Sequence, residues 1–396
     1  MYGCRHLKRI FNKSMCTLLI AVFSTAIISL HLQYVSSKDQ KCNTGEPETT
    51  ITSVRIKYYD VLISGYMRSG STLMGTILGW RNDSFYLYEP LLKIFVWTYW
   101  HGNDTVCRSD RLDCRKVDPG KAVDDKFLSI KQENVSAGSL VMVMKILRNI
   151  FDCQFNDFER TVFHPITAKN GGPSWSQTHS CIKDKRSSTL CLHKYIPRKC
   201  QNATHRVTKV LRLSTDLLAD ILLERENLKV IHLFRDPRAI INSRIETRWF
   251  PLQTEKQIIE HAKSLCNKML YDFEEGQKLL NHFPDRFKVV YYEDLSENTF
   301  NKSKELFKYL GMDLDEHKFP TVRLLTAFSD SKNRTEREKN TAFWWRKSLN
   351  WDILQKIDII CEGVYRALGY KCLKNVEEYQ NMSLSTVDIP KEYLIA

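Results

Sequence analysis

The residues best suited to chemistry lie in the stretch 61–75, whose sequence is VLISGYMRSGSTLMG. An apolar run breaks at Gly65 into a short loop rich in Gly, Ser and Arg, and an apolar-periodic segment follows from Leu73. A strand, a tight loop and a helix start make an anion site, because a helix N-terminus offers unpaired N–H groups and the positive end of its dipole. The loop adds a guanidinium and three hydroxyls, from Arg68, Ser69, Ser71 and Thr72. The stretch therefore predicts a phosphate-type cradle.

The glycine spacing of this loop matches part of a Walker A motif. Gly65 and Gly70 are separated as in G-x-x-x-x-G, and Thr72 stands at the Ser/Thr position. The Walker lysine should follow the second glycine, but that position is Ser71, and the cation is Arg68 instead. The loop therefore departs from a nucleotide triphosphate loop, and a plain Gly-Ser turn is the alternative.

A second basic loop, RDPRAIINSR at 235–244, follows another apolar run. A P-loop NTPase places an Asp at this strand end to help hold magnesium, whereas this chain has Arg235. Pro237 falls in the first turn of a predicted helix, and Ser243 can face back to the same end of the sheet. An Arg with a hydroxyl suits a terminal phosphate, so the two loops together imply a ligand with two separated anionic groups. The alternative is a solvated basic helix start paired with Asp236.

Alternating strands and helices are predicted to position these loops. Strands are predicted at 61–63, 84–90, 140–146, 207–211, 229–234 and 287–292. Helices are predicted after Ser214 and Pro237, and at 254–280, 302–310 and 350–368, the last two ending at Gly311 and Gly369. This alternation is typical of an α/β fold in which helices cover both faces of a parallel sheet.

Cysteine-rich sequence of little periodicity separates some of these elements. Residues 151–206 are predicted to form a disulfide-held insertion that shapes a substrate-binding groove, and residues 91–135 are a further candidate for this role. The alternative is that the insertion has no role in substrate binding. No C-x-x-C and no zinc spacing occurs, so disulfides are the better reading. The insertion cysteines expected to be bonded are Cys153, Cys181, Cys191 and Cys200. Connectivity cannot be deduced, and Cys107–Cys114 and Cys361–Cys372 are guesses based on short loops.

The N-terminus predicts a membrane anchor. Residues 15–32 are almost wholly apolar and follow a basic flank, and about 18 to 20 such residues can span a bilayer. The predicted organisation is a cytosolic tail at 1–14, a signal-anchor at 15–32, a stem at 33–57, a lumenal domain at 58–385 and a C-terminal tail at 386–396. A cleaved signal peptide is the alternative.

Composition agrees with a lumenal address. Ten of the 12 cysteines and seven N-x-S/T sequons lie beyond the apolar segment, as expected for an oxidising, glycosylating compartment. The net charge of +13 favours anionic ligands such as nucleotides or acidic glycans. The 396 residues suit one large α/β domain with appendages.

The two loops carry a family resemblance. LISGYMRSGSTLMG resembles the 5′-phosphosulfate loop of Golgi carbohydrate sulfotransferases, and LKVIHLFRDPRAIINSR is similar to their 3′-phosphate loop. Further motifs resemble those of the galactose, N-acetylgalactosamine and N-acetylglucosamine 6-O-sulfotransferases of keratan and chondroitin type. They are FYLYEP, FDC at 151–153, VVYYEDL at 289–295, WWRKSLNWDI at 344–353, LGYKC at 368–372 and EEYQNMSLS at 377–385. The resemblance covers about residues 58–385. Thr72-Leu73-Met74 replaces the more usual Ser-Phe-Val, a sequon begins at Asn82, and the insertion is divergent, which leaves the acceptor open.

The resemblance implies a P-loop-like sulfotransferase fold that uses 3′-phosphoadenylyl sulfate (PAPS). It implies transfer of a sulfuryl group to the 6-hydroxyl of a Gal, GalNAc or GlcNAc residue, by a single-pass type II protein of the Golgi membrane. The residues assigned to the 5′-phosphosulfate are Arg68, Ser69, Gly70, Ser71, Thr72, Leu73 and Met74. Those assigned to the 3′-phosphate side are Arg235, Asp236, Pro237, Arg238, Ala239, Ile240, Ile241, Asn242 and Ser243, with Arg235 and Ser243 as the expected contacts.

The expected chemistry needs a cation and a base. Arg68 is predicted to stabilise charge on the leaving phosphate, and no metal is expected because two basic loops can neutralise a bisphosphate. Glu89 is the predicted general base, on the expectation that partial burial raises its pKa. A structural role for Glu89, such as pairing with Arg68, is an alternative, and His101 and Glu293 are weaker candidates for the base.

The alternative functions are those of a nucleotide kinase or NTPase and of a non-catalytic glycan-binding membrane protein. The first is weakened by Ser71 and Arg235 at the two Walker positions, and the second would make both anion loops accidental. The expected partners are a glycan acceptor and the membrane, without nucleic acid, and an oligomer is left open.

Overall fold

The computed structural model describes residues 58–92, 98–109, 112–121, 139–155, 165–184, 187–247, 252–297, 299–313 and 341–393. The predicted tail, signal-anchor and stem at 1–57 lie outside these ranges. Within them, no helix combines the length and the apolar character that crossing a membrane requires.

A five-stranded parallel sheet forms the centre of the domain, in the order β2-β6-β1-β7-β8. Its strands are β1 (Tyr59–Gly65), β2 (Ser84–Tyr88), β6 (His205–Val210), β7 (Leu228–Phe234) and β8 (Phe287–Tyr291). The middle of β1 is an apolar run with no exposed surface, as expected for a parallel strand that is covered on both faces. The predicted strands at 61–63, 84–90, 207–211, 229–234 and 287–292 are confirmed.

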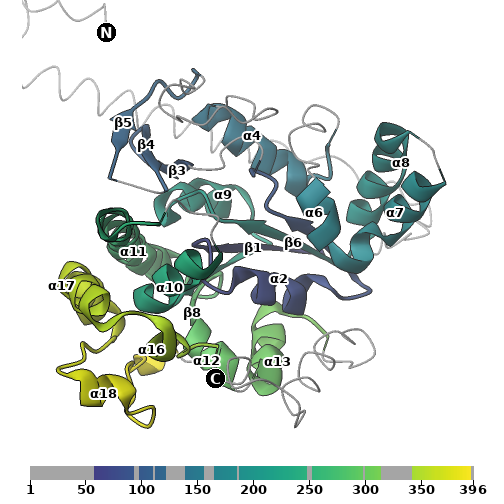
Figure 1. Cartoon of the computed structure of the whole chain (residues 1–396). Helices are drawn as coiled ribbons and strands as arrows, with labels where there is room; N and C mark the ends of the chain where they lie inside the picture. Colours follow the sequence, from purple (N-terminus) through teal and green to yellow (C-terminus); the bar gives the residue numbers. More distant parts are fainter. Residues whose placement is uncertain are drawn as a thin grey trace, which may run out of the picture. The chain divides into compact units, whose positions relative to one another are not determined.

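Helices cover both faces of the sheet (Figure 1). Leu62 points into a hydrophobic cluster on one face, and Val61 and Ile63 point into a second cluster on the other. The first face is covered by α4 (Leu140–Phe151), α9 (Leu218–Glu224), α11 (Glu255–His282) and α17 (Trp351–Leu368). The second is covered by α2 (Ser71–Gly79), α12 (Tyr292–Glu297) and α13 (Thr299–Leu310). The predicted α/β class with a parallel sheet is confirmed.

The predicted strand at 140–146 is wrong, because these residues begin α4. Ser139 caps the helix by accepting a hydrogen bond from the Met142 backbone N–H at 3.2 Å. Most of the buried residues recur at three- and four-residue intervals, namely Leu140, Val143, Met144, Leu147, Ile150 and Phe151, and Ile146 is buried beside them. A continuous apolar run does not by itself separate a buried strand from a buried helix, and here the longer spacing decides.

The stretches expected to be irregular also contain regular structure. The stretch 91–135 contains an antiparallel sheet of β3 (Thr98–His101), β4 (Thr105–Arg108) and β5 (Cys114–Lys116). The cysteine-rich insertion holds α6 (Pro165–Asn170), η2 (Gly172–Trp175), α7 (Ser176–Lys183) and α8 (Ser188–Gln201). Most of these pieces are short, and α8, with 14 residues, has only three buried residues, so its sequence lacks a continuous apolar face.

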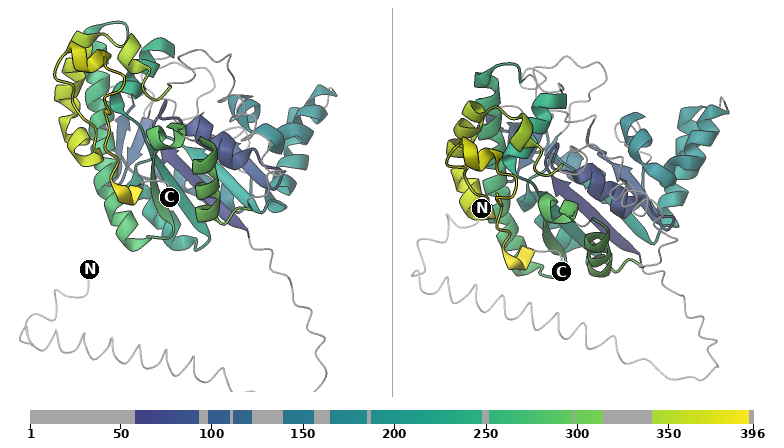
Figure 2. Two further views of the ribbon diagram at one scale, coloured as in Figure 1. Left: turned by 90° about the horizontal axis from the view of Figure 1, so that it is seen from below. Right: turned by 60° about the horizontal axis from the view of Figure 1, so that its bottom comes forward.

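The C-terminal residues pack onto the domain through residue 393. The remaining elements are η3 (Thr215–Leu217), α10 (Pro237–Thr247), α16 (Trp345–Ser348), α18 (Val376–Gln380) and η5 (Lys391–Tyr393). Figure 2 shows α17 beside α11. In the predicted tail, Thr386 and Tyr393 are buried, and the Asp388 backbone N–H bonds to the Gly369 carbonyl at 2.8 Å. Residues 386–393 are therefore part of the folded domain.

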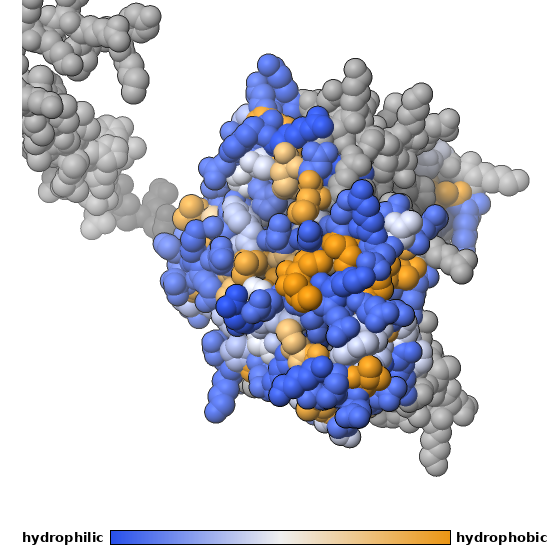
Figure 3. Space-filling model, turned by 60° about the vertical axis from the view of Figure 1, so that its left-hand side comes forward, coloured by the Kyte–Doolittle hydropathy of each residue, from blue (hydrophilic) through white to orange (hydrophobic). Residues whose placement is uncertain are grey.

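On the face shown in Figure 3, hydrophilic residues predominate, with apolar residues in small patches between them.

Four disulfides hold the described part of the chain. They are Cys107–Cys114, Cys153–Cys200, Cys181–Cys191 and Cys266–Cys361. The guess Cys107–Cys114 and the bonding of all four insertion cysteines are confirmed. The guess Cys361–Cys372 is wrong, because Cys361 lies inside α17 against α11 and bonds to Cys266 there, while Cys372 is exposed and free.

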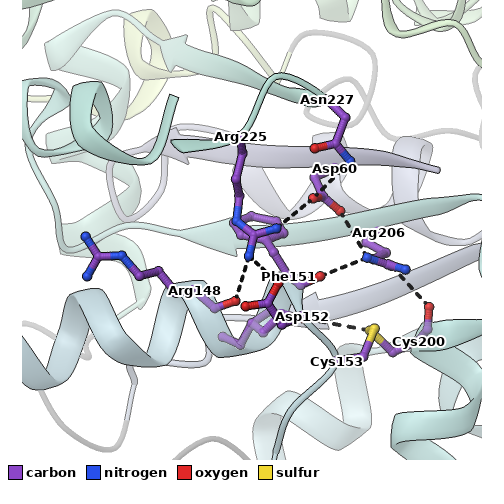
Figure 4. The surroundings of a disulfide bond; sticks show 10 residues. Asp60, Arg148, Phe151, Asp152, Cys153, Cys200, Arg206, Arg225 and Asn227 are labelled. Carbon is purple, nitrogen blue, oxygen red and sulfur yellow. Dashed lines mark hydrogen bonds and ion pairs between the residues drawn. A yellow bond between two sulfur atoms is a disulfide. The ribbon is translucent and has the colours of Figure 1, made fainter. Parts of the chain in front are cut away.

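Charged side chains surround the Cys153–Cys200 disulfide (Figure 4). Arg206 donates to the carbonyls of Phe151 at 2.8 Å and Cys200 at 3.3 Å, so it ties both cysteine-bearing segments to β6. The buried carboxylate of Asp60 lies 3.9 Å from Arg206 and 3.5 Å from Arg225. Burial raises the pKa of Asp60 to about 6, although both arginines act to lower it. The disulfide thus joins the two ends of the insertion, and the hydrogen bonds of Arg206 anchor them to the sheet.

Candidate functional site

The first predicted loop, residues 66–70, joins β1 to α2 at the carboxyl end of the sheet. Gly70 has φ 92°, and a Cβ there would lie 2.1 Å from the Tyr292 ring, so only glycine fits. No side chain caps α2, and the first helical bond runs from the Met74 N–H to the Gly70 carbonyl at 3.2 Å. The N–H groups of the first turn therefore have no acceptor within the helix and are oriented for an anion.

Arg68 connects this loop to the second predicted loop. Its side chain is exposed, and its Nε donates to the Ser243 Oγ at 2.9 Å. Its backbone has φ 76°, an unusual conformation for a residue with a side chain, and its carbonyl accepts from Arg235 at 2.9 Å. The structure thus brings together Arg68 from the loop after β1, Arg235 from the loop after β7 and Ser243 from α10.

Arg235 lies in the wall of the site. Its guanidinium donates to the Thr341 carbonyl at 2.8 Å and lies 4.4 Å from the centroid of the Tyr292 ring. Within the described residues, its buried Nε has no hydrogen-bond partner. A buried cation with an unused donor is suited to an anionic ligand.

Glu89 follows β2 directly and is buried in a double ion pair. Its carboxylate lies 2.9 Å from the Lys209 Nζ and 2.7 Å from an Arg212 nitrogen. Burial acts to raise its pKa, but Lys209 and Arg212 outweigh this effect and lower the pKa to about 2. The expected rise in pKa is therefore wrong, and so is the alternative pairing with Arg68. Glu89 also has φ 41°, which marks local backbone strain.

Lys209 links Glu89 to the first loop. Its ammonium donates to the Thr72 Oγ1 at 3.2 Å and lies over the Tyr88 ring, 3.7 Å from the centroid. Burial lowers its pKa, although Glu89 acts in the opposite direction. One ammonium therefore contacts both the helix start at the anion cradle and the candidate base.

Sequence reasoning missed three residues of this site, Lys209, Arg212 and Tyr292. Lys209 and Arg212 had a usable signal, because Lys209 interrupts the predicted strand at 207–211 and Arg212 follows it directly. Arg244 donates to the Met67 carbonyl, at 3.1 Å from Nε and 2.9 Å from a terminal nitrogen. Burial and then Arg68 lower its pKa to about 9. Tyr292 had no signal, because its contact with Gly70 depends on the folded arrangement.

Several residues of the predicted ranges point away from the site. Met74 and the α10 residues Ala239, Ile240 and Ile241 are buried in the hydrophobic clusters. Arg238 is fully buried and pairs with Asp236 at 2.8 Å and with Asp358 at 3.5 Å. Asn242 donates to the Ser348 Oγ at 2.8 Å. These side chains support the loops, and only their backbones could contact a ligand.

The two weaker candidates for the base lie in different surroundings. His101, at the end of β3, contacts the rings of Tyr99 and Tyr271, and burial lowers its pKa to about 4. Glu293 accepts a hydrogen bond from the Asp236 backbone N–H at 2.9 Å, and burial raises its pKa to about 7. Glu293 therefore belongs to the second loop rather than to the Glu89 side of the site.

The arrangement combines an anion cradle with a carboxylate at one end of the sheet. The cradle offers the helix N-terminus, Arg68, Lys209 and Thr72. The second loop offers Arg235 and Ser243 beside it. In the described part of the chain, no group of three or more His, Cys, Asp or Glu side chains is placed to hold a metal ion. Such a site can bind two phosphate-type groups and hold an acceptor hydroxyl near a carboxylate.

Comparisons with known proteins identify the family of the chain. A family model described as a sulfotransferase domain matches residues 59–376. Carbohydrate sulfotransferase 1 of Danio rerio is 26% identical, covering 90% of this chain and 87% of its own length. Carbohydrate sulfotransferase 3 of Homo sapiens is 22% identical, covering 83% and 70%. A crystal structure of mouse sulfotransferase SULT7A1 complexed with PAP covers 78% of this chain and 85% of its own, with a TM-score of 0.41 and 9% identity. The predicted resemblance to carbohydrate sulfotransferases is confirmed, and the chain belongs to the sulfotransferase domain family.

Proposed function

We propose that this protein transfers a sulfuryl group from PAPS to the 6-hydroxyl of a Gal, GalNAc or GlcNAc residue in a keratan- or chondroitin-type glycan. The observation that carries the proposal is the junction of two basic loops, made by the Arg68–Ser243 and Arg235–Arg68 hydrogen bonds. The relatives named carbohydrate sulfotransferase support a glycan acceptor. The assignment of the 6-hydroxyl as the acceptor group rests on the resemblance of the sequence motifs.

The donor would lie across the two loops. Its 5′-phosphosulfate is assigned to residues 68–74, where the N-terminus of α2 supplies backbone N–H groups. Its 3′-phosphate is assigned to 235–243, with Arg235 and Ser243 as the side-chain contacts. Two basic loops can neutralise the bisphosphate product, and for this reason we propose no metal requirement.

In the proposed reaction, the acceptor oxygen forms a bond to sulfur as the bond from sulfur to the phosphate oxygen breaks. The cradle stabilises the charge that develops on the leaving phosphate. Glu89 takes the proton of the acceptor hydroxyl. Because Lys209 contacts both Thr72 and Glu89, an anion in the cradle competes with Glu89 for this ammonium. Donor binding would therefore weaken the ion pair that keeps Glu89 a poor base.

The test of this function is sulfuryl transfer from labelled PAPS to a panel of keratan and chondroitin acceptors, with ATP as the control donor. We expect label on the 6-hydroxyl of one acceptor class and no phosphoryl transfer from ATP. Phosphoryl transfer from ATP, or binding of glycan without transfer, would reject the proposal in favour of one of the two rival functions.

Arg235→Ala is expected to weaken PAPS binding by at least about tenfold, because a charge-assisted hydrogen bond contributes roughly 1.5 to 3 kcal/mol. The acceptor KM should change less. Equilibrium binding of PAPS and steady-state kinetics measure the two effects. An unchanged donor affinity in a folded variant would remove Arg235 from the donor site.

We also propose a Golgi membrane address with type II topology, from the basic flank and apolar segment at 1–32 and the seven sequons beyond them. The four disulfides agree with an oxidising lumen. Protease added to sealed microsomes should leave the C-terminal domain intact until detergent is added. Digestion in intact vesicles would contradict this topology.

A further inference from the structure

A buried carboxylate outside the donor loops collects hydrogen bonds from three elements. Asp272, in the middle of α11, has no exposed surface. Its Oδ2 accepts from the Tyr66 hydroxyl at 2.7 Å and from the Tyr99 hydroxyl, and its Oδ1 accepts from the Thr215 backbone N–H at 2.9 Å. The Thr215 hydroxyl lies 3.3 Å from Oδ1 and donates to the Asp272 carbonyl at 3.0 Å.

One of these partners belongs to the donor loop. Tyr66 is the first residue after β1, and its backbone closes the loop on Ser69: the Ser69 N–H donates to the Tyr66 carbonyl at 3.0 Å, and the Tyr66 N–H donates to the Ser69 Oγ at 3.3 Å. The Tyr66 hydroxyl also lies 3.3 Å from the His232 Nε2 of β7. Asp272 therefore holds the start of the anion cradle through the tyrosine ring.

The other two partners belong to the side of Glu89. Thr215 follows the segment 212–214, and Arg212 in this segment binds the Glu89 carboxylate. Trp100 of β3, next to Tyr99, is hydrogen-bonded to the same segment. Its backbone N–H donates to the Arg212 carbonyl at 2.9 Å, and its backbone carbonyl accepts from the Ser214 N–H at 2.8 Å. One carboxylate thus links the donor loop to the segment that orients the candidate base.

We propose that Asp272 is a positioning residue, whose ionised carboxylate fixes the donor loop against the segment that holds Glu89 and whose protonation loosens this link. The inference deepens the proposed function and rests on it for the roles of the two loops. An ionised carboxylate only accepts hydrogen bonds, and here both of its oxygens are used. A proton on Oδ2 would require one of the two tyrosine hydroxyls to turn away.

The surroundings of Asp272 determine the pH at which its carboxylate gains this proton. Burial raises the pKa of Asp272 to about 7, against the lowering effect of the bonds from Tyr99, Tyr66 and Thr215. The titratable groups that face it are Tyr66 of the loop, Tyr99 and His101 of β3, Asp216 of η3, His232 of β7, Tyr271 of α11 and, through Tyr66, Tyr370. Burial lowers the pKa of His232 to about 3 and that of His101 to about 4, so both are neutral when Asp272 titrates.

The test is the pH dependence of kcat between about pH 5.5 and 8.5, at saturating PAPS and acceptor. Wild-type kcat should fall as pH decreases through about 7. D272N should lose this dependence, with kcat at pH 8 about 10- to 100-fold below wild type because the cradle and Glu89 are no longer held in register. Y99F removes one donor to the carboxylate, so it should move the fall in kcat to higher pH.

E293Q is the matched control, because Glu293 is a second buried carboxyl whose pKa is about 7. It should keep the fall in kcat near pH 7. If the fall persists in D272N and disappears in E293Q, the inference about Asp272 is wrong.

Thermal unfolding separates positioning from a purely structural role. The pKa of Asp272 is raised on folding, so its contribution to stability is present at low pH and is lost as pH rises from about 4 to about 7. D272N should lack this decrease and should melt no lower than wild type at pH 8 while its kcat is reduced. Melting that is lowered in parallel with kcat would overturn the positioning role. Absence of any transfer by wild type would instead refute the proposed function, while the pH dependence of melting would still test the ionisation of Asp272.

Discussion

Glu89→Gln is expected to reduce turnover about 100- to 10,000-fold at saturating PAPS and acceptor, the usual effect of removing a general base. Glutamine keeps the shape and the hydrogen bond to Arg212 but cannot take a proton from the acceptor hydroxyl. Steady-state kinetics together with equilibrium binding of PAPS measure the effect. Donor affinity should not fall, because Lys209 contacts both Thr72 and Glu89 and glutamine no longer competes with an anion in the cradle for its charge.

A control is needed because the substitution also leaves Lys209 and Arg212 without a buried counter-charge, and breaking such a pair costs about 3 to 5 kcal/mol. A thermal melt of Glu89→Gln will therefore show some loss of stability, and kinetics must be measured well below the melting temperature. Near-normal turnover in the folded variant would exclude Glu89 as the base and leave it a structural partner of the two cations. In the free protein the pKa of Glu89 is about 2, well below that of Asp272.

Replacing Cys266 and Cys361 with serine is expected to cause the largest loss of stability of any single disulfide removal. This bond joins α11 to α17 across 95 residues of sequence, and a loop of about that length is worth about 4.7 kcal/mol in the chain-entropy model. The measurement is the midpoint of thermal unfolding of the double variant under non-reducing conditions.

The matched control is the pair Cys181 and Cys191, which closes only 10 residues within the insertion. The same model gives about 3 kcal/mol or less for so short a loop, so its removal should lower the midpoint by a smaller amount. The opposite order would show that strain or residual structure, rather than loop length, determines the contributions of these disulfides.

The central sheet and the two loops could be predicted because their signals are local. A parallel strand buried on both faces reads as an apolar run, and the loop after β1 has its own glycine and serine chemistry. The same reasoning failed at α4, where an apolar run of seven residues fits either structure until its continuation to residue 151 is known.

The parts that could not be predicted depend on contacts between distant segments. Cys361 lies 11 residues before Cys372 in sequence but faces Cys266 in the folded chain, and only the packing of α17 on α11 shows this. The pKa of Glu89 was misjudged for the same reason. Its burial could be predicted, but the cations beside it come from β6 and the residues just after it, more than 100 residues away in sequence.

The neighbouring positions of β1 and β7 have a consequence for donor selectivity. The two strands are hydrogen-bonded in register, with Gly65 opposite Leu233, so the loops that follow them start from points fixed about 4.8 Å apart. In the proposed donor site, the sheet would thereby fix the distance between the positions of the two anionic groups of the nucleotide. In the proposed donor site, a nucleotide without a 3′-phosphate would reach the first loop and leave the second empty, and one with a 2′-phosphate would present its charge at the wrong distance. Discrimination among nucleotides would then be a property of the backbone ladder as much as of any side chain.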